Sequence, residues 1–263
     1  NSTGSFSFNT GAFTTHSFDK AKAVNYGNGW YRLEITDTTI STTFNTIILS
    51  QNGTTTNYTG DGSSGFYLWG SQFEQGGYAT RYIPNLSTGS TTRSPDASRD
   101  SGTSADINSV EGVFFVEIAA LANDQSSRRI TIAQGTSNLI RVGYDSVSNR
   151  IVAVVYDGAN QAVLLTTSYT ITDFHKIGLL YKENDFALWI NGTEVATDLS
   201  GSTFATGTLN ELAFDDGGGG NLFYGKVKQA MTFKTALNDS ELETLTSWDS
   251  FNAMATGQLY TIE

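Results

Sequence analysis

Several kinds of residue are scarce in this chain of 263 residues, which has no cysteine, two prolines and two histidines. Without cysteine the chain can form neither a disulfide framework nor a thiolate metal site. Basic residues are also few, with 15 lysines and arginines against 26 acidic residues and a net charge of −11. Phosphate binding needs clustered lysine and arginine, so no nucleic-acid partner is expected. No apolar run approaches the length of a membrane span, so membrane insertion is not expected either.

Glycine, threonine, serine, asparagine and aromatic residues are abundant, and short strand-like runs alternate with turn signals along the chain. This composition predicts an all-β protein, because glycine and asparagine make turns while threonine and aromatics fill strands. The clearest pattern spans residues 174–197. Apolar residues recur there at every second position on both sides of a polar turn, and Asn191-Gly192 is the strongest short hairpin signal. Three antiparallel strands from the middle of a sheet are therefore predicted.

The predicted architecture is two antiparallel β-sandwiches with one short C-terminal helix. Asn238 and Glu241 fit a capping box, so the helix is expected to begin there and to end near Trp248. Residues 85–109 are almost entirely polar and cannot form a core. We therefore expect a first domain at 1–92, a linker at 93–109, a second domain at 110–250 and a tail at 251–263. Short strands of the first domain are expected at 5–8, 12–17, 30–36, 44–49, 66–73 and 80–83.

The end of the first domain carries a motif of aromatic, polar and glycine residues. It comprises Trp69-Gly70, Gln72, Glu74, Gly76, Thr80, Tyr82-Ile83-Pro84, Arg93 and Asp96, with Gly27-Asn28-Gly29-Trp30-Tyr31-Arg32 upstream. This pattern resembles the end of a carbohydrate-binding-like jelly roll that is common in bacteriophage tail and fibre proteins, and it departs from that family at Arg81 and Asn85. The resemblance implies that the N-terminal strands of the jelly roll are missing. Because the chain also lacks an initiator methionine and a signal peptide, we interpret it as a fragment or a processed product.

The second half resembles the concanavalin A-like, laminin-G-like domains that follow such modules in phage proteins. The matching stretches are His175-Lys176-Ile177, Tyr181-Lys182, Asn184-Asp185-Phe186-Ala187-Leu188, Asn191-Gly192, Phe214-Asp215-Asp216-Gly217, Tyr224-Gly225, Ala236-Leu237 and Glu241-Leu242. The resemblance implies a β-sandwich of about residues 110–250 with a glycan-binding or purely structural role. It does not imply catalysis, because that superfamily hosts lectins, glycosidases and inert spacers.

The sequence offers few groups for catalysis. Gly60 to Gly65 matches the dinucleotide-binding fingerprint, but a predicted strand follows where that fingerprint needs a helix, so we interpret it as a turn. The two histidines lie in different predicted domains without the spacing of metal ligands. Glycosidases need two carboxylates across the scissile bond, and Glu117 has no acidic residue at the alternate positions that follow it. We therefore predict no enzyme activity, and a solvent-facing or edge position for Glu117.

The loop from Asp215 to Asn221 is the main candidate site. Two carboxylates, an amide and free backbone carbonyls are oxygen ligands suited to Ca²⁺, and four glycines let the backbone curl. The alternative is a long hairpin loop with aspartate capping its turn. Aromatic rings can stack on the apolar face of a sugar, although a tryptophan of a sandwich can equally lie in the core. The predicted metal ligands are Asp215, Asp216 and Asn221, and the predicted glycan-binding residues are these three with Tyr224 and Trp189.

The resemblances favour a non-catalytic segment of a virion fibre or spike that displays glycan-binding β-sandwiches at the virion surface, outside the cell. The expected partners are a host-surface glycan, other virion proteins and further copies of the chain in a homotrimer. The alternative is a pair of carbohydrate-binding modules from a secreted polysaccharide-degrading enzyme. A third hypothesis, an enzyme in its own right, is disfavoured because no paired-acid motif is present.

Overall fold

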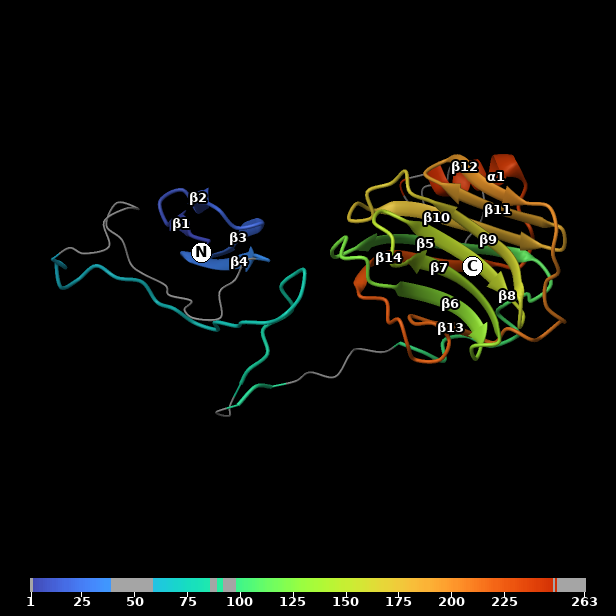
Figure 1. Cartoon of the computed structure of the whole chain (residues 1–263), viewed down its shortest axis with the longest axis horizontal. Coiled ribbons are helices and arrows are strands. Elements are labelled where there is room, and N and C mark those ends of the chain that lie inside the picture. Colours follow the sequence, from blue (N-terminus) through green and yellow to red (C-terminus); the bar gives the residue numbers. More distant parts are fainter. Residues whose placement is uncertain (1, 39–58, 86–88, 92–97, 248, 250–263) are drawn as a thin grey trace. The chain divides into compact units, whose positions relative to one another are not determined.

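A computed structural model describes residues 2–38, 59–85, 89–91, 98–247 and 249 of the chain. The chain divides into two compact units, Asn1–Arg93 and Ser94–Glu263. Both are built from antiparallel strands, which confirms the predicted all-β class (Figure 1). The described part has no helix that is long and apolar enough to cross a membrane.

The first unit contains two small sheets. Strand β1 (Gly4–Ser7) pairs with β2 (Ala12–His16), and β3 (Lys20–Gly27) pairs with β4 (Trp30–Thr36). The turn between β3 and β4 places Asn28 and Gly29 at φ of 51° and 80°, which only glycine and a few polar residues adopt readily. The Gly27-Asn28-Gly29 pattern had predicted this turn.

Two of the strands expected in the first unit are absent from its described part. Residues 66–73 and 80–83 have no strand conformation, and the strand expected at 44–49 lies outside the described residues. Side-chain hydrogen bonds connect these segments instead of a backbone ladder. Gln72 Oε1 accepts the backbone N–H of Ile83 at 2.7 Å, and Glu74 Oε1 accepts that of Thr80 at 2.6 Å. Completion of this unit by strands from elsewhere stays a prediction.

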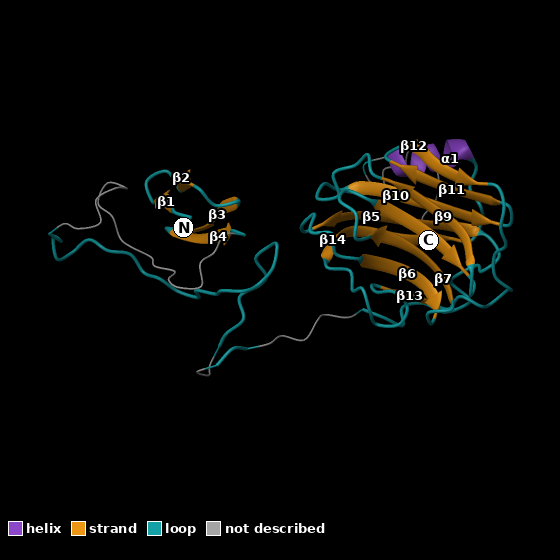
Figure 2. Cartoon of the chain, viewed as in Figure 1, coloured by secondary structure: helices purple, strands orange, loops and turns teal. Residues whose placement is uncertain are grey.

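The second unit is a sandwich of two five-stranded antiparallel sheets, shown with its helix in Figure 2. The first sheet has the order β12-β11-β10-β5-β14, and the second has the order β13-β6-β7-β8-β9. The elements are β5 (Gly112–Ala120), β6 (Arg128–Gln134), β7 (Asn138–Tyr144), β8 (Ile151–Tyr156), β9 (Asn160–Thr166), β10 (His175–Lys182), β11 (Asp185–Ile190), β12 (Thr193–Asp198), β13 (Glu211–Ala213), β14 (Gly225–Phe233) and α1 (Asp239–Ser247). Strands β10, β11 and β12 are the three strands predicted from residues 174–197, but they form one end of the first sheet, with β12 at its edge, and not its middle.

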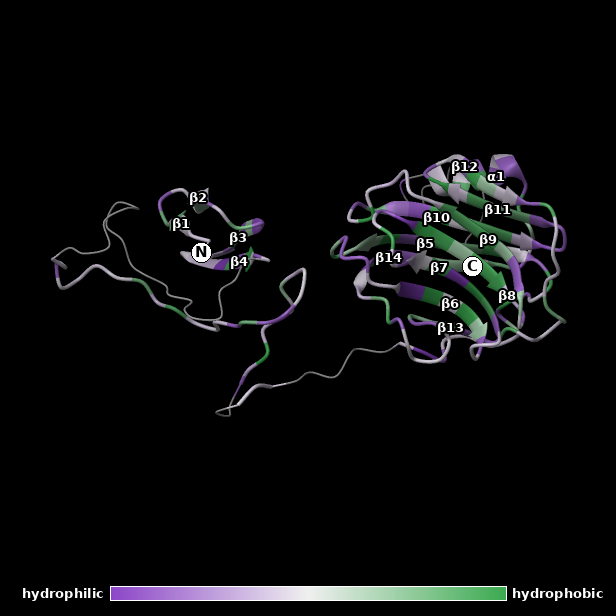
Figure 3. Ribbon diagram, viewed as in Figure 1, coloured by the Kyte–Doolittle hydropathy of each residue, from purple (hydrophilic) through white to green (hydrophobic). Residues whose placement is uncertain are grey.

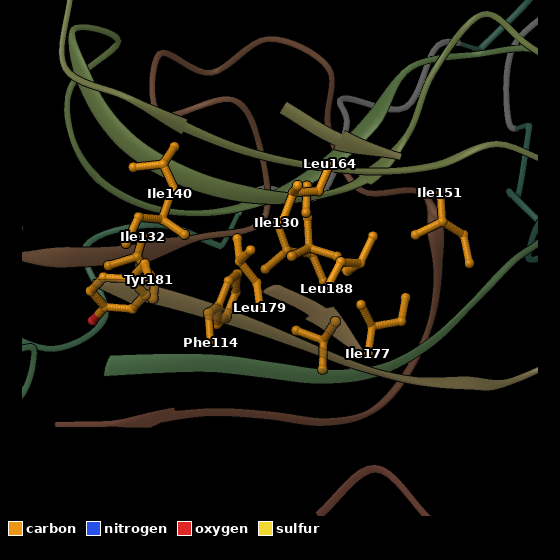
Figure 4. Packing of buried hydrophobic residues seen from close by; sticks show 14 of the residues in the cluster. Phe114, Ile130, Ile132, Ile140, Ile151, Leu164, Ile177, Leu179, Tyr181 and Leu188 are labelled. Carbon is orange, nitrogen blue, oxygen red and sulfur yellow. The ribbon is translucent and has the colours of Figure 1, made fainter. Parts of the chain in front are cut away.

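The main core lies between the two sheets (Figure 4). Phe114, Leu179 and Leu188 point inward from the first sheet, and Ile132 and Ile140 face them from the second. The alternating direction of side chains along each strand supplies this inward set, and Figure 3 shows that the strands of both sheets are rich in hydrophobic residues. The sandwich predicted for the second domain is confirmed.

A second, smaller cluster lies on the other side of the first sheet. Helix α1 packs there, with Leu242 and Leu245 against Phe115, Leu180 and other side chains of the sheet. The predicted capping box is present, because the side chain of Asn238 accepts the N–H of Glu241 at 3.1 Å and that of Glu241 accepts the N–H of Asn238 at 2.8 Å. The first sheet is therefore covered on both faces.

The predicted linker is shorter than expected. Ser98 and Ser101 accept hydrogen bonds from the backbone N–H groups of Phe214 and Leu212, at 2.8 and 2.7 Å. Ile107 is buried in the main core. The part of 93–109 that begins at Ser98 therefore belongs to the second unit. Composition does not predict this attachment, because backbone groups make most of these contacts and every residue has them.

Candidate functional site

Asp215, a predicted ligand for Ca²⁺ and glycan, is buried with a side-chain exposure of 0%. Its Oδ2 lies 2.9 Å from Nε of Arg99, and its Oδ1 accepts the N–H of Gly217 at 2.6 Å. The hydroxyl of Thr131, on β6, donates to the backbone carbonyl of Asp215. Asp215 thus attaches its loop to β6 and to the segment before β5, and its carboxylate is not available to a sugar.

Asp216 is occupied by its own loop. Its Oδ1 accepts the N–H groups of Gly218 and Gly220 at 3.0 and 2.9 Å, and its Oδ2 accepts the side-chain amide of Asn221 at 2.8 Å. Burial raises the pKa of Asp216, but these hydrogen bonds and the charge of Arg129 outweigh it and lower the pKa below its ordinary value. This is the aspartate-capped turn that the sequence left open as the alternative.

The three predicted metal ligands do not converge on one point. Asp215 points toward Arg99, while Asp216 and Asn221 bond each other. The described residues contain no group of three or more histidine, aspartate or glutamate side chains placed to hold a metal ion. Binding of Ca²⁺ stays a prediction, and the ion would have to displace the guanidinium of Arg99 and the internal donors of the loop.

The two aromatic candidates have different environments. Trp189 is 7% exposed and lies in the cluster under α1, so its predicted role in stacking on a glycan is wrong. The alternation of residues in β11 predicted two faces without showing which is buried. Both are buried, because helix α1 covers the second one. Tyr224 is 40% exposed and remains accessible at the end of the loop.

Glu117 is neither solvent-facing nor at an edge, as the sequence had suggested. It is 4% exposed on β5, a central strand between β10 and β14. Its Oε1 lies 2.7 Å from Nζ of Lys228, and its Oε2 accepts the side-chain amide of Gln229 at 3.2 Å. The ammonium group of Lys228 also lies 4.3 Å from the ring centre of Phe174. Both carboxylate oxygens have partners, and neither partner is a second acid.

The outer face of the second sheet carries a group of residues that sequence reasoning missed. Four of its apolar side chains are buried but belong to neither core cluster, and these are Ala133, Leu139, Val152 and Val154. The same face carries three half-buried side chains, those of Arg129, Arg141 and Tyr156. Each is an even number of residues from an apolar residue of this face in its own strand, so both point the same way. We call these seven residues the arginine face. The signal was the alternation of Arg129 and Arg141 with inward-facing isoleucines.

The two arginines of this face are diagonal neighbours. Arg129 on β6 is opposite Gly143 on β7, and Arg141 is opposite Thr131. Burial lowers the pKa of Arg141, and the charge of Arg129 lowers it further, against the opposite pull of Asp216 and Asp145. Nε of Arg141 is buried without a hydrogen-bond partner in the described structure. The face therefore combines buried apolar side chains with two guanidinium groups, and Nε of Arg141 is a donor without an acceptor in the described structure.

A hollow at the end of β6 and β13 adjoins this region. Its lining residues include the acids Asp100 and Glu211 and the short segments around Thr103 and Gly135. Burial raises the pKa of Glu211, and the hydrogen bond and charge of Asp100 raise it further. The two acids are close enough to repel each other when both are ionised.

Comparisons with known proteins find similarity in structure alone. The chain matches no protein-family model and no curated protein. Solved structures similar to it include the CBM40 of the Ruminococcus gnavus IT-sialidase bound to α2,3 sialyllactose, with 15% identity, TM-score 0.44, and 57% of this chain and 94% of that chain covered. A SAP-like pentraxin from Limulus polyphemus has 12% identity, TM-score 0.47 and coverage of 61% and 80%. Sheep galectin-11 has 11% identity, TM-score 0.35 and coverage of 54% and 100%.

We expect Arg99→Ala to lower the free energy of unfolding by about 2 kcal/mol. Removing one partner of a buried pair costs about 3–5 kcal/mol, and the value is discounted because the side chain of Arg99 is 37% exposed. Urea denaturation measures the change. In an Asp215→Asn background the same substitution should cost less than about 0.5 kcal/mol, because the buried charge is gone. Equal costs in both backgrounds would show that the pair does not anchor the loop.

Replacing Glu211 should change how stability depends on pH. Its raised pKa means that the folded state favours the protonated acid, so this stabilising contribution is present at low pH and is lost as pH rises through the folded pKa. Glu211→Gln stays neutral and should gain stability relative to the parent between about pH 4 and pH 7, by less than about 1 kcal/mol. Glu183→Gln, in the exposed turn after β10, is the control. A stability difference that is the same at both pH values contradicts the prediction.

Proposed function

We propose that this chain is a non-catalytic, glycan-binding segment of a virion fibre or spike. The observation that carries the proposal is the arginine face, where the aromatic ring of Tyr156 and the donors of Arg129 and Arg141 are half-buried on one side of the sheet. Sugar-binding sites need both properties, because a pyranose ring offers an apolar C–H face and hydroxyl groups around it. On the opposite sheet, helix α1 covers the outer face at β10, β11 and β12.

The first unit supports the virion context. Its resemblance to the end of the jelly roll of phage tail and fibre proteins rests on residues such as Gln72, Glu74 and Thr80, which the structure connects through hydrogen bonds. In a fibre, identical chains are arranged around one axis. One shallow site binds a sugar with about 4 kcal/mol, near millimolar affinity, and repetition in a homotrimer raises the avidity by a factor of about a hundred or more.

The environment of Glu117 supports the absence of catalysis. A glycosidase needs a second carboxylate that acts across the scissile bond, and the partners of Glu117 are a lysine and an amide. Both carboxylate oxygens of Glu117 are therefore occupied by contacts within the fold.

We expect Tyr156→Ala to weaken binding to an array of host-surface glycans by at least about fivefold, since an aromatic side chain contributes about 1 kcal/mol or more to such a contact. Tyr224→Ala is the matched control at the loop and should bind like the parent chain. The reverse result would place the site at the loop that the sequence indicated. Absence of binding by the parent chain to any glycan would contradict the proposed function.

Incubation with a panel of neutral and acidic polysaccharides should release no new reducing ends and no unsaturated products. The physical reason is that no described residue offers a second carboxylate beside Glu117. Product formation that Glu117→Gln abolishes would show that the chain is an enzyme. Product formation that survives this change would indicate a contaminating hydrolase.

A further inference from the structure

We infer that the arginine face binds a carboxylate-bearing sugar, with Arg129 and Arg141 as the pair that holds its carboxylate. This inference rests on the proposed glycan-binding function and names the class of glycan. It starts from how the arginines of the second unit are paired. Arg99, Arg128 and Arg150 each form an ion pair with an aspartate, at 2.9, 2.7 and 2.5 Å.

Arg129 and Arg141 form no ion pair in the described part of the chain, although they are neighbours on one sheet face. This is unexpected in a chain with 26 acidic residues and 15 basic residues, where carboxylates are plentiful. Asp216 is the acid that attracts both arginines, but its oxygens already accept three hydrogen bonds from its own loop. Two like charges are thus held together, and the nearby carboxylates of Asp216 and Asp145 attract Arg141 without forming an ion pair with it.

Half-burial makes this arrangement costly without a ligand. The guanidinium group of an arginine stays charged in a protein. Burial of Arg141 therefore disfavours a charge that the group cannot lose, and the charge of Arg129 beside it adds to this cost. An incoming anion that reaches the half-buried guanidinium groups would offset the repulsion between them, and this gain contributes to binding.

A carboxylate fits this pair better than a hydroxyl group does. Its two oxygens lie in one plane and match the forked donors of a guanidinium group, and a charge-assisted hydrogen bond is about twice as strong as a neutral one. Val152 and Val154 lie beside the pair on β8 but are buried, so the half-buried ring of Tyr156 is the apolar surface on this strand that a sugar can reach. Gly143, between Arg129 and Val152 in the sheet, adds no side chain that would fill this space.

The glycine at this position also has a structural reason. A Cβ atom added at Gly143 would lie 2.0 Å from the backbone carbonyl oxygen of Arg128, closer than any real contact. Strands β6 and β7 therefore approach closely where the two arginines lie. This close approach holds the bases of both side chains in place, which reduces the entropy lost when a ligand orders their ends.

The test uses immobilised oligosaccharides that end in a hexuronate or a sialate, each beside its carboxyl-reduced counterpart, in which an alcohol replaces the acid. The intact chain should bind the acidic member of at least one pair at least about tenfold better, because a charge-assisted contact is about 1.4 kcal/mol or more stronger. Raising the salt concentration from about 50 to about 300 mM should weaken only the acidic member, through screening.

Three variants and a control locate the contact. Arg141→Gln and Arg129→Gln should each remove most of the preference for the acid, and Arg141→Lys should restore it only in part because it lacks the fork. Lys182→Gln, exposed at the end of β10, changes the net charge equally and should keep the preference. Thermal denaturation of each variant checks its fold, and Arg129→Gln tests the face independently if Arg141→Gln is unstable.

The outcomes separate the inference from the function on which it rests. Equal binding of acidic and carboxyl-reduced glycans, unchanged by the arginine variants, would overturn the inference and leave glycan binding intact. A preference for the acid that all three arginine variants keep would overturn the assignment to this face. Failure to bind any acidic, reduced or neutral glycan would overturn both the inference and the proposed function.

Discussion

Burial of β5 on both of its faces is the constraint on which the second unit depends. All nine residues from Gly112 to Ala120 are buried, so neither side of this strand can face water. Phe114 points into the space between the sheets, while Phe115 points to the side that α1 covers. Leucine burial contributes on the order of 2 kcal/mol per side chain, more than the ~1 kcal/mol of a helix cap. Packing on the first sheet, chiefly on β10, β11 and β12, therefore positions the helix, and the cap adds to it.

This constraint decides which surface of the sandwich is free for a ligand. The helix and the residues around it take the outer face of the first sheet, where Glu117 and Trp189 become part of the interior. The outer face of the second sheet has no described helix upon it. A sandwich with one helix thus has two different outer faces, and the second presents the half-buried side chains of Arg129, Arg141 and Tyr156.

Local features of the fold could be predicted from the sequence. The Asn191-Gly192 turn, the alternation in β10 and β11 and the capping box at Asn238 each depend on residues close together in the chain. Features set by distant residues could not. Whether Trp189 is exposed depends on α1, about fifty residues later, and whether Asp215 is free depends on Arg99, more than a hundred residues earlier. The candidate loop is the aspartate-capped turn that the sequence left open as the alternative, and its carboxylates are occupied by Arg99 and by donors of the loop itself.

The arginine face was missed for a related reason. Arg129 and Arg141 each look like an ordinary polar position in an alternating strand, and only the register of β6 on β7 makes them neighbours. Their arrangement differs from the charge pairing of the other arginines in this unit. The chain pairs Arg128 and Arg150 with nearby aspartates, yet two adjacent guanidinium groups on a partly desolvated face form no ion pair in the described part of the chain. Local conflicts of this kind concentrate at functional sites, because selection for stability alone would remove them. Repulsion between the two guanidinium groups lowers stability until an anion binds, and binding of the anion relieves it. We therefore infer that this face favours acidic sugars over neutral ones.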